Sequence, residues 1–225
     1  MQKLLFLTPE LPYPPQSGGK LKSGKLLESL AERYAVTLAS PLKADDAMHL
    51  CDFTASTRCS ASLHEPVSVP RSARSLAGSY LLRRPLNVHR SYSAPLADRV
   101  RTTIYEHDVV VLDHYEVAAY LPDDYRGLVV YHAHNAYHQL WRRYAQLPGN
   151  PVTRLAALLE ASRVHAFETR IARRADLVFA APNDAAELRR AGVPDERLRD
   201  TFHLGDDAQL ALPELEFDQT RKKLM

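Results

Sequence analysis

The sequence predicts an α/β protein built on a doubly wound, parallel sheet, and three observations lead to that prediction. First, short apolar runs recur along the chain, with the composition of strands that are buried on both faces. Second, longer stretches with helical spacing separate these runs. Third, the first run leads into a loop rich in proline, which neither a helix nor an inner strand accommodates. The five clearest runs are Lys3–Leu7, Ala35–Ala39, Asp108–Leu112, Leu128–His132 and Asp176–Ala180.

The first forty residues predict one strand–helix–strand unit. After the strand Lys3–Leu7, the loop Pro9–Gly19 (PELPYPPQSGG) contains four prolines and two glycines. A helix is expected from Gly19 to Tyr34, and Ala35–Ala39 (AVTLA) is the second strand, reached by a right-handed crossover. The helix residues that recur at helical spacing and should face the sheet are Gly24, Leu27, Ala31 and Tyr34.

The middle of the chain is less regular. Between Pro41 and Pro70 we expect loops with one short strand near Pro66–Val69. Two helices should follow, Ser72–Leu82 and Ser93–Glu106, and the second has a proline in its first turn. The next elements in order are the strand Asp108–Leu112, a short helix at Tyr115–Tyr120, a turn at Pro122–Gly127 and the strand Leu128–His132.

Two helices dominate the last third. Asn135 is expected to cap a helix that runs to Gln146, and the prolines of residues 148–151 end it. The long helix Thr153–Arg174 has two apolar stripes, which predicts either a bend or packing against two elements. The first stripe holds Leu155, Leu158, Leu159, Ser162 and Ala166, and the second holds Val164, Phe167 and Ile171.

The chain then closes with a strand, a helix that Gly192 ends, and a last strand, at Asp176–Ala180, Asn183–Ala191 and Thr201–Leu204. From Gly205 to Gln219 the sequence becomes acidic and loses its pattern. We therefore expect residues 1–205 to form one Rossmann-like domain and residues 206–219 to be a linker. Residues 220–225 resemble the truncated start of a further domain.

Composition narrows the class of protein. The chain has 225 residues, 45% of them hydrophobic and 25% charged, with a net charge of +2, so its overall balance does not indicate nucleic-acid binding. Two cysteines, Cys51 and Cys59, make neither a disulfide framework nor a zinc set, which favours a reducing cytoplasm. No apolar stretch reaches the roughly 20 residues of a membrane helix. A cytoplasmic location is expected, with the inner-membrane surface as an alternative.

Ligands of doubly wound sheets bind at the carboxyl ends of the strands, and three segments should meet there. In the first, Gly18 and Gly19 open a helix whose unpaired N–H groups would attract phosphate, although a plain flexible turn is the simpler interpretation. The spacing matches neither a Walker A loop nor GxGxxG. The other two segments are Asp113-His114-Tyr115 and His132-Ala133-His134-Asn135.

The histidines at this edge of the sheet are candidates for catalysis or for substrate binding. His134 could act as an acid or base, or bind a sugar hydroxyl or phosphate, unless it is a structural histidine. Asp113 and His114 could bind an acceptor hydroxyl, although capping a loop is as good an explanation. His132, His134 and His138 could suggest a metal, but their spacing separates His138 from the other two, and we expect no metal site.

Arginines crowd the two helices of the last third, with Glu160 and Glu168 among them. This pattern is typical of a solvated, salt-bridged face, and a membrane-surface role is the alternative. The set is Arg142, Arg143, Arg154, Arg163, Arg170, Arg173 and Arg174.

Three segments together resemble a known family. The opening LLFLTPELPYPPQSGGKLKSGKLLESLAERYAVTL resembles the start of bacterial glycosyltransferase family 4 proteins of the exopolysaccharide-biosynthesis type. VVYHAHNAYHQLWRRYA and ETRIARRADLVFAAPNDAAEL resemble later parts of the same proteins, in the same order.

The resemblance implies a GT-B architecture, in which an N-terminal domain holds the acceptor and a C-terminal domain holds the nucleotide-sugar. It implies retaining transfer without a metal or other cofactor, to a glycan or a lipid-linked acceptor. Gly18 and Gly19 would then meet the donor diphosphate, and His134 would be catalytic. Asp113, His114 and Asn135 would shape the acceptor side. The donor-binding glutamates of the C-terminal domain are missing from these 225 residues, so this chain alone is expected to be inactive.

Two other functions remain open. The chain could be a non-catalytic scaffold or partner subunit of a polysaccharide-assembly complex, which would show an apolar patch where a second domain docks. It could also be another Rossmann-like sugar-nucleotide enzyme. The missing GxGxxG, and Ser40-Pro41 where an acidic residue should end the second strand, argue against a nicotinamide cofactor.

Overall fold

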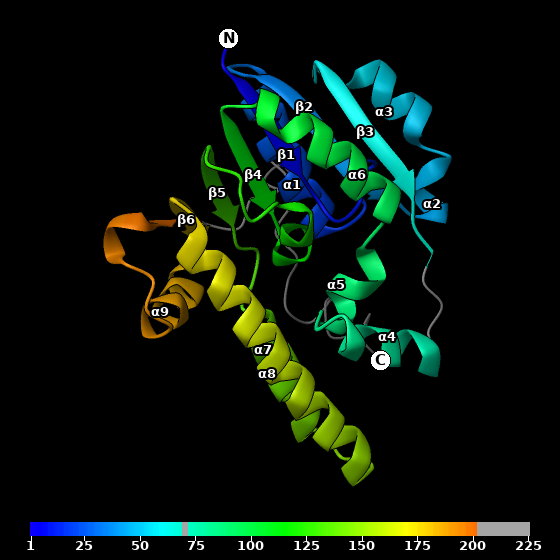
Figure 1. The fold of residues 1–225 in the computed structure, drawn as a ribbon, viewed down its shortest axis with the longest axis vertical. Coiled ribbons are helices and arrows are strands. Elements are labelled where there is room, and N and C mark those ends of the chain that lie inside the picture. Colours follow the sequence, from blue (N-terminus) through cyan, green and yellow to red (C-terminus); the bar gives the residue numbers. More distant parts are fainter. Residues whose placement is uncertain (69–71, 202–225) are drawn as a thin grey trace, which may run out of the picture.

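The computed structural model describes residues 1–68 and 72–201. At their centre is a seven-stranded sheet, whose neighbouring strands are all parallel and follow the order β3-β2-β1-β4-β5-β6-β7 (Figure 1). This confirms the predicted α/β class and the doubly wound sheet. The strands are β1 (Lys3–Leu7), β2 (Ala35–Leu42), β3 (Ala61–Pro66), β4 (Val109–Asp113), β5 (Leu128–His132), β6 (Leu177–Ala180) and β7 (Leu198–Asp200).

The chain starts in the middle of the sheet and builds outwards twice, from β1 to β3 and then from β4 to β7. Crossovers between parallel strands are almost always right-handed, so the two halves place their helices on opposite faces. On one face, α1 (Gly18–Ala31) and α3 (Leu50–Ser56) bury Leu27 and Phe53 against β1 and β2. On the other face, α6 (Ala94–Thr103) and α8 (Pro151–Arg174) contribute to a larger core.

The segment between β2 and β4 is more regular than its sequence indicates. We expected loops and a strand near Pro66–Val69, but α2 (Ala44–Ala47) and α3 occupy the first part, and β3 lies earlier, at Ala61–Pro66. Every residue of β3 is half-buried or exposed, so this edge strand lacks the apolar run by which inner strands are recognised.

The predicted helices between β3 and β5 are present with small changes. Ser72 caps α4 (Ala73–Leu81) through its side chain, α6 has its proline in the first turn, and a 3₁₀ turn, η1 (Ile104–Glu106), extends it. The short helix before β5 is the 3₁₀ helix η2 (Tyr115–Tyr120). One helix, α5 (Leu86–Ser91), was not expected.

The helix α7 (Tyr137–Gln146) does not begin as predicted. Its N-cap is Ala136 rather than Asn135, and no side chain of the cap bonds the first turn. The buried carboxylate of Glu168 takes that role, because it accepts the N–H groups of Tyr137 at 3.1 Å and His138 at 3.5 Å. The cap comes from a residue thirty positions away, so no local pattern could show it.

The two apolar stripes of α8 differ in burial. Val164, Phe167 and Ile171 are buried against the sheet as expected. The helix α8 packs against α7, η2 and β5, so the predicted second packing partner is present. Leu155, Leu158 and Leu159 are nevertheless about half exposed, so the first stripe faces largely away from these contacts. Within residues 1–68 and 72–201, none of the helices has both the length and the apolar character that crossing a bilayer requires.

The described part of the chain ends with α9 (Pro182–Arg190), after which Gly192 has a positive φ of 83°, and with the 3₁₀ turn η3 (Asp195–Arg197) before β7. The last described strand is β7, just before Thr201; the predicted strand Thr201–Leu204 lies, beyond its first residue, outside the described residues. The predicted linker, residues 206–219, and the predicted start of another domain, residues 220–225, lie outside the described residues.

Candidate functional site

The carboxyl ends of β4 and β5 bring three predicted residues together. Asp113, the last residue of β4, pairs in register with His132, the last residue of β5. Oδ1 of Asp113 accepts hydrogen bonds from Nδ1 of His132 and Nε2 of His134, both at 2.7 Å. His132 and His134 are two positions apart, so an extended backbone points both side chains toward the same carboxylate.

Burial defines what this cluster can do. Asp113 is fully buried, and His132 and His134 are each only 4% exposed. Burial alone would raise the pKa of Asp113, but the hydrogen bonds from His132 and His134 lower it well below its usual value. The ionised carboxylate then holds both imidazoles with their N–H groups toward it. For His134 this leaves Nδ1 as an acceptor, with no hydrogen bond to it from the described residues.

His114 completes the histidine cluster in a strained backbone conformation. Its φ is 97°, a left-handed value that is rare for a residue with a side chain and is often found at functional sites. Its ring lies 4.2 Å from the ring of His134, and its Nε2 is 3.2 Å from the hydroxyl of Tyr137. Burial, with repulsion from His134, lowers the pKa of His114 to about 3, so the ring is neutral at pH 7.

Glu116, two residues further on, is a titratable group that the sequence did not single out. Burial raises its pKa to about 7, and Glu10 adds to this shift while Lys43 opposes it. Glu10 and Lys43 form an ion pair and belong to the loops after β1 and β2, so Glu116 lies at the same edge of the sheet as the histidines. A carboxyl group that titrates near pH 7 is suited to general acid or base catalysis.

Gly18 and Gly19 are exposed in the first turn of α1. The side chain of the N-cap Ser17 accepts the N–H of Lys20, and the N–H groups of a first turn have no partner within the helix. Neither glycine has a positive φ, and a Cβ at Gly18 would have no atom within 4 Å. Backbone geometry therefore does not require glycine here, and the space around Gly18 is open to a ligand.

Asn135 lies exposed between His134 and α7, so its amide is available at the edge of the cluster. His138, which the sequence grouped with His132 and His134, lies elsewhere. Its Nδ1 is 3.1 Å from Oε2 of Glu168, the carboxylate that caps α7. The structure thus separates a structural histidine, His138, from the three that form the cluster.

The cluster also has the composition of a metal site. Asp113, His132 and His134 each offer one ligand atom, and these atoms lie within 4.8 Å of one another. Two imidazoles and a carboxylate are ligands that zinc and iron use. Here Oδ1 of Asp113 accepts both N–H groups, whereas Oδ2 is buried and has no hydrogen-bond partner among the described residues. A metal would have to displace a proton from each imidazole.

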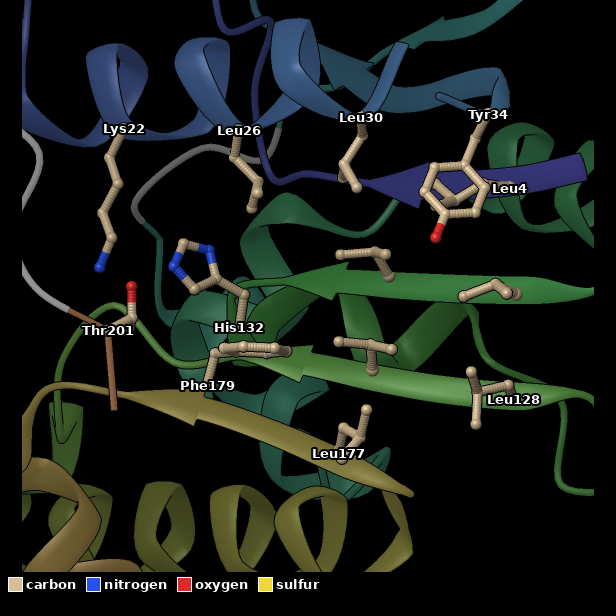
Figure 2. Close-up of a pocket in the computed structure, with 13 residues that line it drawn as sticks. Leu4, Lys22, Leu26, Leu30, Tyr34, Leu128, His132, Leu177, Phe179 and Thr201 are labelled. Atoms are coloured by element: carbon tan, nitrogen blue, oxygen red, sulfur yellow. The ribbon is translucent and has the colours of Figure 1, made fainter. Parts of the chain in front are cut away.

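An apolar groove of about 310 Å³ lies on one face of the sheet, beside α1 (Figure 2). Alternate residues of β4, β5 and β6 form its floor, and Leu26, Leu30 and Tyr34 form its wall. The floor residues are Val109, Val111, Leu128, Val130, Leu177 and Phe179. The groove ends at the carboxyl edge with three polar residues, Lys22, His132 and Thr201, so it meets the histidine cluster there.

Lys22 is the unusual residue of that end. It is buried, and its Nζ has no hydrogen-bond partner among the described residues. Burial lowers the pKa of Lys22, while the charges of Asp113 and Asp184 oppose the shift. The sequence did not indicate Lys22, because nothing in GGKLKSGK distinguishes a buried lysine from its exposed neighbours.

Comparisons with known proteins give a distant structural likeness without a match in sequence. No family model matches the chain, and no curated protein matches it. Among solved structures, a UDP-glucose:anthocyanidin 3-O-glucosyltransferase in complex with UDP superposes with a TM-score of 0.49 at 12% identity. The superposition covers 99% of this chain and 57% of that protein, so this chain spans little more than half its length.

Proposed function

We propose that this chain is the acceptor-side half of a GT-B glycosyltransferase, which transfers a sugar from a nucleotide-sugar to a glycan or lipid-linked acceptor in cell-surface polysaccharide synthesis. The observation that carries the proposal is the pair formed by Asp113 and His134 at the carboxyl edge of the sheet. The same edge holds the exposed first turn of α1, at Gly18 and Gly19. The family resemblance of three segments adds to this geometry.

His134 has the central role in the proposal. Because Asp113 fixes its Nε2–H, Nδ1 can accept a hydrogen bond from a hydroxyl of the reacting sugars. Asp113 is then a positioning residue that acts through His134. His114 and Asn135 contribute polar groups on the acceptor side, and Glu116 is a second group able to take up or release a proton near pH 7.

The donor would bind by its diphosphate at the first turn of α1. A helix N-terminus carries about half a positive charge and several unpaired N–H groups, which suit phosphate oxygens. Most of the donor site, and the glutamates that the family resemblance implies for it, would belong to a second domain. We propose that transfer is retaining and needs no metal, as the family resemblance implies.

The test has two parts. The purified chain should bind UDP, GDP or ADP weakly, with a Kd in the millimolar range, and should show no transfer by itself. In the enzyme assembled with its donor domain, His134→Ala should stay folded with a lowered melting temperature, because the buried Asp113 loses one of its two hydrogen bonds. It should lower kcat by at least about a hundredfold, the usual contribution of a general acid or base. Unchanged transfer in His134→Ala would remove this residue from the mechanism.

A scaffold or partner subunit in polysaccharide assembly is the second candidate, and the groove favours it. An exposed apolar surface on a sheet is typical of a docking site for another polypeptide. This function needs no turnover, so Asp113→Asn and His134→Ala would leave it intact. Assembly that survives these substitutions, without any sugar transfer by the complete complex, would favour the scaffold over the enzyme.

A further inference from the structure

The helices α7 and α8 form an antiparallel hairpin that runs out from the sheet, and its tip is the turn at residues 147–150 (Figure 1). The side chain of Asn150 accepts the N–H of Val152 and so caps α8, while the guanidinium of Arg154 donates to the carbonyl of Ala145. These two hydrogen bonds fix the conformation of the turn. The hairpin is therefore a defined structure that projects from the domain.

The surface of this hairpin is apolar to an unusual degree. Of the fifteen large hydrophobic side chains exposed in the described chain, seven lie within residues 140–159. They are Leu140, Tyr144, Leu147, Val152, Leu155, Leu158 and Leu159. Single exposed leucines are common, but a contiguous group of this kind marks an interaction surface.

The distribution of small and large residues is inverted relative to a helix pair in water. Ala145, Ala157 and Ala161 are the buried residues between the helices, whereas the leucines of α8 point outward and are half exposed. In a water-soluble hairpin the large side chains would be inside, since burying a leucine stabilises by about 1.5–3 kcal/mol. The exposed leucines therefore indicate an apolar environment outside the hairpin.

The charge of the hairpin identifies that environment. The sequence has no aspartate or glutamate from residue 125 to residue 159. Arg142, Arg143 and Arg154 are exposed there, and none of them pairs with a carboxylate within the described residues. A surface that combines leucines, aromatic residues and unpaired arginines is complementary to anionic lipid headgroups above an apolar layer.

We propose that the tip of the α7–α8 hairpin, residues 140–159, inserts into the surface of a membrane that contains anionic lipids. Leu147, Val152 and Leu155 enter the boundary between headgroups and acyl chains, to the depth of about 5–10 Å that interfacial helices reach. Arg142 and Arg143 contact lipid phosphates. This is an interfacial contact and involves no spanning segment. It rests on the surface of the hairpin alone and does not require the proposed transferase activity.

The hairpin would also connect this surface to the histidine cluster. The first residue of α7, Tyr137, follows His134 by three positions and touches His114. Ten residues of helix, at 1.5 Å each, then separate that end from the tip by about 15 Å. If the acceptor is lipid-linked, a membrane bound at the tip would bring its headgroup within reach of the carboxyl edge.

The experiment uses the single tryptophan, Trp141, which lies in α7 beside the arginines. The full chain is mixed with vesicles of phosphatidylcholine alone, or with 30% phosphatidylglycerol. Only the anionic vesicles should carry the protein in flotation, shift the Trp141 emission to the blue, and quench it when brominated acyl chains are used. Salt at 0.5 M should weaken binding, because the contact is partly electrostatic.

Two sets of variants locate the contact. The triple variant L147S/V152S/L155S should lower the vesicle partition coefficient at least tenfold, and R142Q/R143Q should lower it about fivefold for each arginine. The matched controls, L76S/L81S in α4 and R33Q just after α1, alter equally exposed residues and should bind like the wild type. Circular dichroism should give the same melting temperature for all of them.

Three results would overturn the proposal. The first is equal binding to neutral and anionic vesicles, or none to either. The second is binding that the control substitutions weaken as much as the hairpin substitutions do. The third is a dimer in solution, measured by light scattering, that L147S/V152S/L155S converts to a monomer while vesicle binding is absent. That result would make the hairpin a contact between two copies of this chain.

Discussion

An aspartate in place of Gly18 should separate ligand binding from stability, because the two are expected to change in opposite directions. Gly18 is exposed in the first turn of α1, and no atom lies within 4 Å of the position of an added Cβ. A carboxylate there interacts favourably with the helix dipole, which contributes about 0.3–1 kcal/mol to folding. The free energy of unfolding of G18D should therefore rise or stay constant.

The same carboxylate would repel a bound diphosphate. Two unit charges 4 Å apart cost about 1 kcal/mol in water and about 4 kcal/mol near a protein surface. The Kd of G18D for a nucleoside diphosphate should therefore increase at least about fivefold, and up to about a thousandfold. A loss of binding together with a gain of stability cannot be explained by damage to the fold.

The assay is a titration of the chain with UDP, GDP and ADP, followed by the backbone amide shifts of residues 17–20, alongside thermal unfolding. Gly149→Asp is the matched control. Gly149 is also exposed, in the turn between α7 and α8, and the nearest atom to its added Cβ is at 4.0 Å. Unchanged affinity in G18D, or an equal loss in Gly149→Asp, would refute the assignment of the diphosphate to this helix end.

Three further predictions concern protons and metal. The pKa of His114 is about 3 in the folded protein, so between about pH 6.5 and pH 3 this side chain is protonated only in the unfolded state. The free energy of unfolding should therefore decrease as the pH is lowered through this range, by up to about 1.4 kcal/mol per pH unit. His114→Asn should flatten this slope in denaturant titrations. Burial raises the pKa of Glu116 from 4.5 to about 7, so the free energy of unfolding should fall as the pH rises from about 4.5 to about 7 and stay lowered above that, and Glu116→Gln should unfold at a higher temperature than the wild type at pH 8 but not at pH 4. Dialysis against a chelator should leave the melting temperature unchanged, whereas a drop that zinc restores would show that Asp113, His132 and His134 hold an ion.

Inner strands were predictable from sequence because burial on both faces requires uninterrupted apolar runs. Lys3–Leu7 and Leu128–His132 have the bounds that the sequence indicates. The edge strand β3 was misplaced for the same reason, since its sequence ASLHEP faces partly into solvent and has no such run. The expectation for the stripe at Leu155 was wrong for a different reason. Apolar residues at helical spacing predict a buried face, and here that face of α8 is exposed.

The sequence predicts where the candidate site lies in the fold, but it does not predict the hydrogen bonds within it. The rule that ligands meet the carboxyl ends of parallel strands selected Asp113, His114 and His134 correctly as neighbours. That Asp113 is buried beneath two imidazoles depends on the register between β4 and β5, which pairs it with His132. The shifted pKa of Glu116 and the burial of Lys22 arise from contacts across several loops, which local sequence does not contain.

The bare groove follows from topology more than from any single residue. Once the chain has moved from β3 back to β4, each later strand is added in the same direction, and right-handed crossovers send their helices to one face. The opposite face of β4, β5 and β6 can then be covered only by polypeptide that is not a crossover of this sheet. Parallel sheets are normally buried on both faces, and the apolar residues at alternate positions, such as Val130 and Phe179, are those of a covered surface. The topology and the apolar floor therefore predict that polypeptide outside residues 1–68 and 72–201 covers this face, whichever of the two proposed functions the chain has.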